Sequence, residues 1–449
     1  MRGRYILMLA ALLSCVSCLK DDNSYKTPQA AITSFTIGYY NVKFHDMNIH
    51  GRDTLVNIRE GGIMYPMSID QVNNRIFNVD SMAYGSDLSG VTTTVYGNGT
   101  IGYRYMDDPM VKYLWRSQDS IDFTRKVQFV VQSTDGSFDR VYDVQVNIRK
   151  VFPDSLIWSA PDTVGFPVLS GLSSAVRNDS VFCFGTDTLG APTVSFRSVT
   201  GGNWTGANAM AGITGTDWSH RVTVCNGKFY TVSANSLYAS SDALNWSQVK
   251  SGIKSLIVSV DDYGMLWAVS QDSNLVKSSD MTDWTTVQRV PENFPDSAAY
   301  IMTYPLVTNA SLTRSVIAGL GSDSLSASVW TILTGDTVWT KVDVPADKNL
   351  SLPASASLSL IRYDGAVYGL GQGLDGFRQS NDNGITWYLC KSYVEDYSSW
   401  NRYMQLPAAL KGYASDFTVT TDKRGYIWIM TDNGCAWRGA ITRLINLIK

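Results

Sequence analysis

A repeat in residues 151–449 constrains the fold of this chain more than any other feature. Each copy joins a tight turn, an aromatic-rich strand, a second strand and, in most copies, a tryptophan. The clearest copies are Asn226–Tyr230 with Trp246, Asp262–Trp267 with Trp284 and Tyr363–Tyr368 with Trp387, and weaker ones are Asn178–Phe182 with Trp204, Arg314–Ile317 with Trp339 and Arg424–Trp428. A four-stranded sheet cannot bury both faces alone, so the copies must stack in a circle. The repeat predicts a six-bladed β-propeller, and the uneven spacing leaves five or seven blades open.

The ends of this region complement each other. The copy at Arg424–Trp428 has no tryptophan after its strands, whereas Leu156–Trp158 is a short apolar strand with no partner nearby in the sequence. We expect this strand to complete the last blade and Trp158 to take the place of the missing sixth tryptophan. Such closure would remove the exposed sheet edges of an open stack.

Residues 380–387 match the Asp-box pattern SxDxGxTW, which is typical of propellers. In this motif we assign structural roles to Ser380, Asp382, Gly384, Thr386 and Trp387. The polar side chains are expected to bind backbone amides, the glycine to supply a positive φ, and the tryptophan to pack between blades. Shortened relatives stand at Ser240–Asp242 with Trp246 and at Ser278–Asp280 with Trp284.

Residues 30–150 contain short apolar runs with period two, bounded by Gly, Asp and Asn. This pattern predicts antiparallel β-strands, and the Asp135-Gly136 pair between two of the runs predicts a hairpin. The length and the number of runs suit an immunoglobulin-like β-sandwich in architecture, although the Cys, Trp, Cys framework of antibody domains is missing. The whole chain is therefore expected to be all-β.

The first 18 residues have the layout of a secretory signal, with Arg2 and Arg4 before an apolar run that is too short to span a bilayer. Cysteines after small residues suggest a lipoprotein signal. Cys15 fits the lipobox better, but Cys18 precedes Lys20-Asp21-Asp22, which resembles a surface-export signal, and we favour Cys18. An ordinary cleaved signal is the remaining alternative. Residues 19–29 read as a tether.

Charge and residue types exclude several classes of function. The formal net charge is −3 and Lys and Arg are scattered, so we expect no nucleic-acid partner. The three histidines are not spaced as metal ligands, and we expect no metal and no cofactor. We expect buried thiols rather than disulfides at Cys183, Cys225, Cys390 and Cys435.

The best candidate ligand-binding residues lie in long segments between blades, which line one mouth of a propeller. Aromatic faces with polar neighbours suit sugars. The candidates are Tyr393, Tyr397, Trp400, Arg402 and Tyr403 in one segment and Trp218, His220 and Arg221 in a second. A third segment carries Phe294, Tyr300 and Tyr304. The rival interpretation is that these aromatics pack onto the ring.

A sialidase-like enzyme is the main catalytic alternative. Such chemistry needs an arginine cluster, a tyrosine nucleophile with its glutamate and an aspartic acid. Phe196-Arg197-Ser198-Val199 does not match the early Phe-Arg-Ile-Pro motif of sialidases, and Glu292 and Glu395 are the glutamates of the propeller region. We assign no catalytic residue and expect a binding or scaffold role for a glycan or a protein partner.

Five segments resemble a family of Bacteroidetes lipoproteins of unknown function, numbered 6242. They are Ala31–Phe35, Arg75–Met82, Asp119–Phe123, Tyr142–Ile148 and Pro153–Trp158. The resemblance implies a two-domain protein anchored in the cell envelope, which we expect at the surface of the outer membrane. It brings no catalytic residues to transfer.

Overall fold

The structure is a computed structural model and describes residues 27–47, 53–152, 155–214, 218–260, 264–295, 298–321, 327–344, 350–390 and 404–442. These residues form an all-β protein with two short 3₁₀ turns, η1 (Gly62–Met64) and η4 (Ala408–Leu410). The chain divides into two compact units, Met1–Phe152 and Pro153–Lys449.

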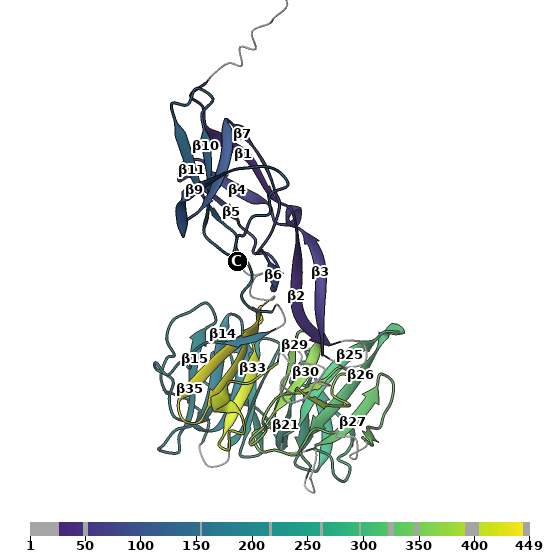
Figure 1. Cartoon of the computed structure of the whole chain (residues 1–449). Helices are drawn as coiled ribbons and strands as arrows, with labels where there is room; N and C mark the ends of the chain where they lie inside the picture. The colour runs from purple at the N-terminus through teal and green to yellow at the C-terminus, as the bar shows by residue number, and fades with distance from the viewer. Residues whose placement is uncertain are drawn as a thin grey trace, which may run out of the picture. The chain divides into compact units, whose positions relative to one another are not determined.

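The first unit contains three sheets, whose strands Figure 1 labels where there is room. The strands are β1 (Ala31–Ile37), β2 (Tyr39–Met47), β3 (Asp53–Gly61), β4 (Met67–Asp70), β5 (Arg75–Asn78), β6 (Ser86–Asp87), β7 (Thr93–Asn98), β8 (Thr100–Tyr105), β9 (Asp108–Leu114), β10 (Val127–Gln132) and β11 (Asp139–Gln145). Their orders are β1-β7, β4-β5-β11-β10-β8-β9 and β3-β2-β6. The hairpin predicted around Asp135-Gly136 is confirmed, because β10 and β11 pair antiparallel and Gly136 has φ +73°.

One part of the antiparallel prediction is wrong. Strands β11 and β5 pair in parallel, with Asp143 opposite Arg75 and Gln145 opposite Phe77. The period of two that identifies a strand is the same in parallel and antiparallel sheets, so the sequence pattern could not distinguish them.

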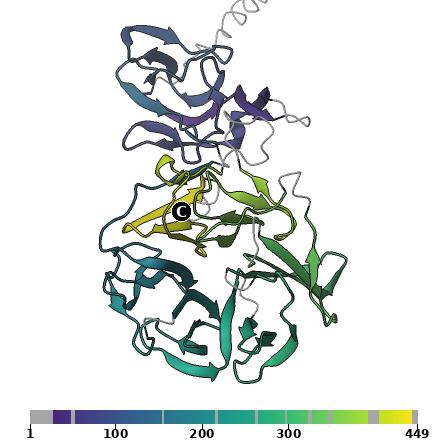
Figure 2. The ribbon, with the colours of Figure 1, turned by 90° about the horizontal axis from the view of Figure 1, so that it is seen from below.

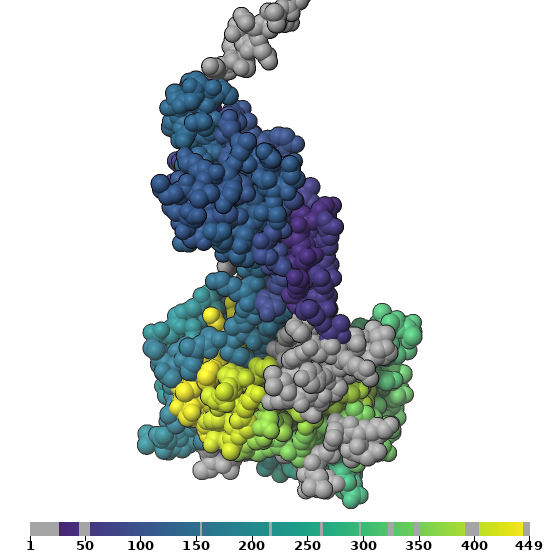
Figure 3. Space-filling model, in the orientation of Figure 1, coloured from purple at the N-terminus to yellow at the C-terminus, as the bar shows by residue number. Residues whose placement is uncertain are grey.

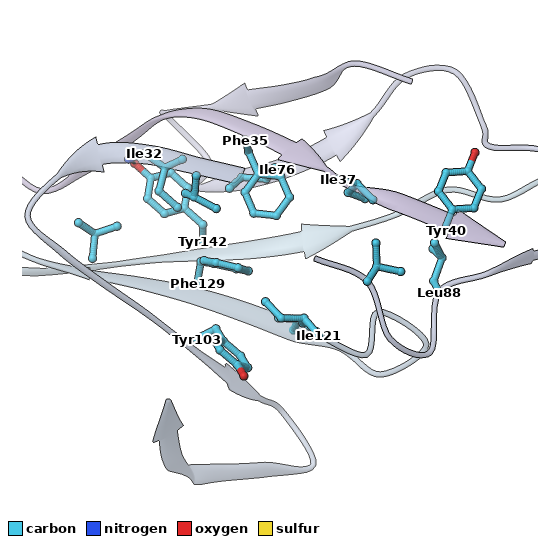
Figure 4. Packing of buried hydrophobic residues seen from close by; sticks show 14 of the residues in the cluster. Ile32, Phe35, Ile37, Tyr40, Ile76, Leu88, Tyr103, Ile121, Phe129 and Tyr142 are labelled. Carbon is cyan, nitrogen blue, oxygen red and sulfur yellow. Dashed lines mark hydrogen bonds between the residues drawn. The ribbon is translucent and has the colours of Figure 1, made fainter. Parts of the chain in front are cut away.

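The core of the first unit lies between β1 and the six-stranded sheet. Figure 4 shows Ile32, Phe35 and Ile37 of β1 on the side that faces Phe129 and Tyr142. The rings of Phe35 and Phe129 meet edge to face at 5.1 Å. The Tyr142 hydroxyl accepts a hydrogen bond from the Ile32 amide (3.2 Å), so the polar tip of this buried ring has a partner.

The second unit consists of consecutive sets of four strands. Its strands are β12 (Leu156–Trp158), β13 (Ser170–Arg177), β14 (Ser180–Thr186), β15 (Pro192–Ser198), β16 (Asn208–Ala209), β17 (Trp218–Cys225), β18 (Lys228–Ser233), β19 (Ser236–Ser240), β20 (Ser247–Ser251), β21 (Ile253–Ser259), β22 (Leu266–Ser270), β23 (Asn274–Ser278), β24 (Thr285–Arg289), β25 (Tyr300–Leu306), β26 (Asn309–Gly319), β27 (Ser328–Leu333), β28 (Thr340–Val342), β29 (Ser359–Tyr363), β30 (Ala366–Leu370), β31 (Arg378–Ser380), β32 (Tyr388–Leu389), β33 (Phe417–Thr421), β34 (Ile427–Thr431) and β35 (Cys435–Ile441).

We call these sets 1 to 6. Sets 1 to 5 are β13–β16, β17–β20, β21–β24, β25–β28 and β29–β32, and set 6 is β33–β35 with β12. Sets 3 and 4 join through parallel pairing of β21 with β25 into one eight-stranded sheet. Figure 2 shows the sets following one another around a ring, in colour order from teal through green to yellow.

Six clusters of buried apolar side chains join neighbouring sets, and the series returns to its start. Phe184 of set 1 and Phe229 of set 2 have ring centroids 5.6 Å apart. Trp204, which follows β15 of set 1, meets Trp428 of set 6 at 6.1 Å. The last set therefore packs on the first, and the yellow C-terminal residues lie beside teal residues in Figure 3.

Strand β12 closes this ring. It pairs antiparallel with β35, with Leu156 opposite Ile441 and Trp158 opposite Gly439. Trp158 packs against the cluster between sets 5 and 6, and its Nε1 donates to the Gln405 carbonyl at 2.8 Å. The other five clusters each contain or contact one of the tryptophans that follow the strands of a copy, namely Trp204, Trp246, Trp284, Trp339 and Trp387. Trp158 therefore occupies the position that the repeat predicts for a sixth tryptophan.

Candidate functional site

The candidate site is a cavity of about 450 Å³ in the second unit. It is lined by residues of the first strand of every set, which are β13, β17, β21, β25, β29 and β33, and we call these the inner strands. A cavity of this size is within the range of small-molecule sites.

Hydrogen bonds join neighbouring inner strands all the way around the cavity. Four use a serine or threonine hydroxyl, one uses the Tyr300 hydroxyl, and the bond between Val258 and Ala299 uses backbone atoms. The bonds are Val222 N to Ser173 Oγ (3.0 Å), Ser259 N to Thr223 Oγ1 (3.4 Å), Val258 N to Ala299 O (3.0 Å), Tyr300 Oη to Leu358 O (2.8 Å), Val419 N to Ser359 Oγ (3.3 Å) and Ser174 Oγ with Thr418 Oγ1 (2.7 Å). The wall of the cavity is thus a preformed polar frame.

We call the part of the cavity at the starts of the inner strands its N-terminal end. His220 lies there in β17 with φ +51°, inside an irregularity between Trp218 and Val222. The imidazole lies against Gly171, where a Cβ would come within 2.5 Å of the ring. Its Nε2 is 2.8 Å from Thr186 Oγ1. Burial lowers the pKa of His220, which favours the neutral ring at neutral pH.

Among the described residues that line the cavity, Asp416, directly before β33, is the only one with a carboxylate side chain. Its Oδ2 accepts a hydrogen bond from the Leu172 amide at 2.7 Å, and its Oδ1 accepts one from the Ser357 hydroxyl. Both oxygens therefore hold the frame together at the N-terminal end.

Arg221 reaches across the N-terminal end from β17 toward β25. Its guanidinium lies over the Tyr300 ring, 4.7 Å from the centroid, and Nη2 donates to the Ala299 carbonyl at 3.0 Å. Its Nε is buried without a hydrogen-bond partner in the described part of the chain, as is the nearby Ser219 Oγ. Both residues line the cavity.

The structure brings some predicted candidates together and leaves others aside. His220 and Arg221 line the cavity, as does Tyr300 of the third segment. Trp218 is only 4% exposed, and it donates from Nε1 to Thr231 Oγ1 at 2.8 Å and packs beside the His220 ring. Phe294 is buried between sets 3 and 4. The candidates that lie outside the described residues are Tyr393, Tyr397, Trp400, Arg402 and Tyr403.

Sequence reasoning missed several lining residues, among them Ser219, Ser357, Asp416 and the cations at the other end of the cavity, Arg177, Arg362 and Lys423. A signal that could have found Asp416 is its position directly before the apolar strand β33.

The Asp box has the structural geometry expected from its residues. Ser380 Oγ donates to Asp382 Oδ1 and accepts from the Gly384 amide, each at 2.8 Å. Asp382 accepts from the amide and hydroxyl of Thr386 at 2.8 and 2.6 Å. Gly384 has φ +96°, and its carbonyl accepts from Trp387 Nε1 at 3.1 Å.

The two shortened relatives repeat this arrangement without glycine. Ala243 and Met281 take the positive φ, at +68° and +64°, and their carbonyls accept from Trp246 and Trp284. Hydrogen bonds from backbone amides, first that of Asn245, lower the pKa of Asp242.

Within the described residues, the four cysteines form no disulfide, and burial raises the pKa of Cys390 to about 12. No group of three His, Cys, Asp or Glu side chains in this part of the chain could hold a metal ion. No helix among the described residues has the length and apolarity to cross a membrane.

Comparison with known proteins identifies two domains. A family model described as the DUF6242 beta-propeller domain matches residues 152–448, and that of the DUF6242 N-terminal domain, a domain of unknown function, matches residues 35–146. A search of curated proteins finds no match.

Similar solved structures include a DUF4623 family protein from Bacteroides eggerthii, with 10% identity over 92% of this chain and 98% of that chain and a TM-score of 0.36. An α-L-arabinofuranosidase from Fusarium graminearum has 11% identity over 63% and 98% (TM-score 0.38), and the lectin SapL1, in complex with α-methyl fucoside, has 12% over 60% and 90% (TM-score 0.38). Similarities at this level say nothing about function.

Proposed function

The chain belongs to the DUF6242 family, and because that family's function is unknown we propose a role from the residues themselves: a ligand-binding lipoprotein of the cell envelope. Its binding site is the N-terminal end of the cavity, and its ligand is a glycan. We further infer that the six sets are six blades of a propeller, with sets 3 and 4 as two blades joined at their inner strands. The first unit is an immunoglobulin-like sandwich.

The preformed frame around the cavity carries this proposal. Inner strands from all six sets contribute polar side chains to one space, and hydrogen bonds between neighbouring strands fix their positions. A rigid site loses little entropy on binding, and hydroxyl, imidazole and guanidinium groups are suited to the hydroxyls of a sugar. Tyr397 and Trp400, which lie outside the described residues, remain candidates from the sequence for aromatic contacts with a sugar.

Filling the cavity tests the binding site. We expect Ser219→Tyr to lower affinity for the glycans that the wild-type chain binds on an array by about tenfold or more, because the larger side chain occupies the N-terminal end. Ser251→Tyr, on the exposed outer strand β20, is the matched control and should bind normally. Unchanged binding by Ser219→Tyr would place the site elsewhere.

The array also separates the proposed module from the alternative, a divergent sialidase-like or other glycoside-cleaving enzyme. Saturable binding without turnover of aryl glycosides supports the module, whereas turnover would favour the enzyme. Tyr397→Ala and Trp400→Ala test the interblade segment in the same assay. If no glycan binds and no aryl glycoside is turned over, a structural role or a protein partner would remain.

Lipidation of Cys18 is the proposed anchor, since several acyl chains on one cysteine contribute about 0.8 kcal/mol per buried methylene. We expect Cys18→Ala to move the protein from the membrane fraction to the soluble fraction, measured by fractionation and by the mass of the N-terminal peptide. Cys15→Ala is the matched control and should remain membrane-bound. The opposite pattern would assign the lipid to Cys15.

A further inference from the structure

The charges that line the cavity differ in sign from the charge of the whole chain. The chain carries a formal net charge of −3. The cavity, in contrast, is lined by Arg177, Arg221, Arg362 and Lys423, with Asp416 as the carboxylate among the described lining residues. Arg221 and Asp416 lie at the N-terminal end, and Arg177, Arg362 and Lys423 lie at the other end. The cavity as a whole has an excess of cations, which raises the local concentration of anions.

The backbone irregularity in β17 lies at the edge of this cavity. Ser219, His220 and Arg221, which are among the residues that line the cavity, all fall between Trp218 and Val222, where the register of β17 shifts. Such an irregularity re-aims side chains, and His220 within it has a positive φ. A non-glycine residue in this conformation is uncommon and costs energy.

Arg221 has the geometry of an anion receptor. The Tyr300 ring supports the guanidinium face, and the Tyr300 hydroxyl is itself fixed by its bond to the Leu358 carbonyl (2.8 Å). The guanidinium makes no ion pair within the described residues, and its Nε is buried without a partner. The Ser219 hydroxyl, also buried without a partner there, can donate to the same ligand.

Asp416 does not compete for Arg221 in the described hydrogen bonds. Its two oxygens accept from the Leu172 amide and the Ser357 hydroxyl, which belong to other strands. A guanidinium fork matches pairs of oxygens in a carboxylate or a phosphate, and a carboxylate is the acidic group of a sugar acid.

We propose that the N-terminal end of the cavity binds the carboxylate of an acidic sugar, with Arg221 and Ser219 as its donors and the polar frame around the sugar hydroxyls. This inference rests on the proposed function, because it names the ligand class of the same cavity. It assigns selectivity for uronic acids over the corresponding neutral sugars.

Calorimetric titration of the full chain with matched saccharides tests the inference. Galacturonate is compared with galactose and with the methyl ester of galacturonate, and glucuronate is compared with glucose. We expect the uronates to bind at least about tenfold tighter than their neutral partners, and added salt to weaken only the uronates. Arg221→Gln should lower uronate affinity by about tenfold or more, and Arg221→Lys by less, because lysine keeps the charge but loses the planar fork.

Arg289→Gln is the control, since Arg289 is exposed on the outer strand β24 and does not line the cavity. Thermal melting establishes that each variant folds. If Arg221→Gln does not fold, Arg221→Lys still tests the inference. Equal affinity for acidic and neutral partners would overturn the inference while leaving the binding function in place. Failure of all these saccharides to bind also overturns it, whereas the array with Ser219→Tyr decides the binding function separately.

Discussion

Replacing Trp387 by alanine is expected to destabilise the protein by about 3–5 kcal/mol, the usual cost of removing a large aromatic side chain from a core. Trp387 is 0% exposed and belongs to the cluster that joins sets 4 and 5. Its removal leaves a cavity between two sheets and breaks the bond from Nε1 to the Gly384 carbonyl. Urea denaturation followed by fluorescence measures the loss as a lower midpoint.

Tyr388→Ala is the matched control, because this aromatic is the next residue in the chain but 41% exposed. We expect a change of about 0.5 kcal/mol or less. If the two variants had similar midpoints, the packing role of the Asp-box tryptophan would be contradicted.

Gly439→Val is the second substitution with a large expected effect. A Cβ on Gly439 would lie 2.6 Å from the Trp158 ring, at the pair of strands that closes the ring of sets. The Trp158 ring cannot move away easily, because its Nε1 also donates a hydrogen bond to the Gln405 carbonyl. We expect a loss of about 1–3 kcal/mol, typical of overpacking, measured by the same denaturation.

The double variant with Trp158→Ala provides the internal control. With the ring removed, Gly439→Val should cost less than about 1 kcal/mol beyond the cost of Trp158→Ala alone. If Gly439→Val destabilised the wild-type chain and the Trp158→Ala variant equally, the clash with the Trp158 ring would not be the cause of the loss of stability.

The sequence revealed the second unit better than the first. Aromatic strands, turns and tryptophans recur in it, so a pattern that is weak in one copy, as at Arg314–Ile317, is supported by the others. The first unit has no repeat, and its parallel pair β5 and β11 joins segments far apart in the chain, which alternation alone cannot pair.

The candidate site was harder to predict than the fold. His220 and Arg221 were found because they stand next to Trp218 in a recognisable segment. The sequence could not show that Trp218 is buried whereas His220 and Arg221 line the cavity, because the irregularity in β17 changes which side chains face it. Alternation in a regular strand would have placed Trp218 and His220 on one face and Arg221 on the opposite face.

By itself the sequence determined that the chain is built of β-strands, that a repeated unit must share its apolar faces with neighbours, and that Trp158 lacks a local partner. These properties are local, since each depends on residues within one strand or one turn. Only the tertiary structure decided that Ser219, Arg221, Tyr300 and Asp416 meet at one cavity. The reason is physical: Ser219 and Arg221 come from one copy, Tyr300 and Asp416 come from two others, and only stacking of the sets around a ring brings these copies together.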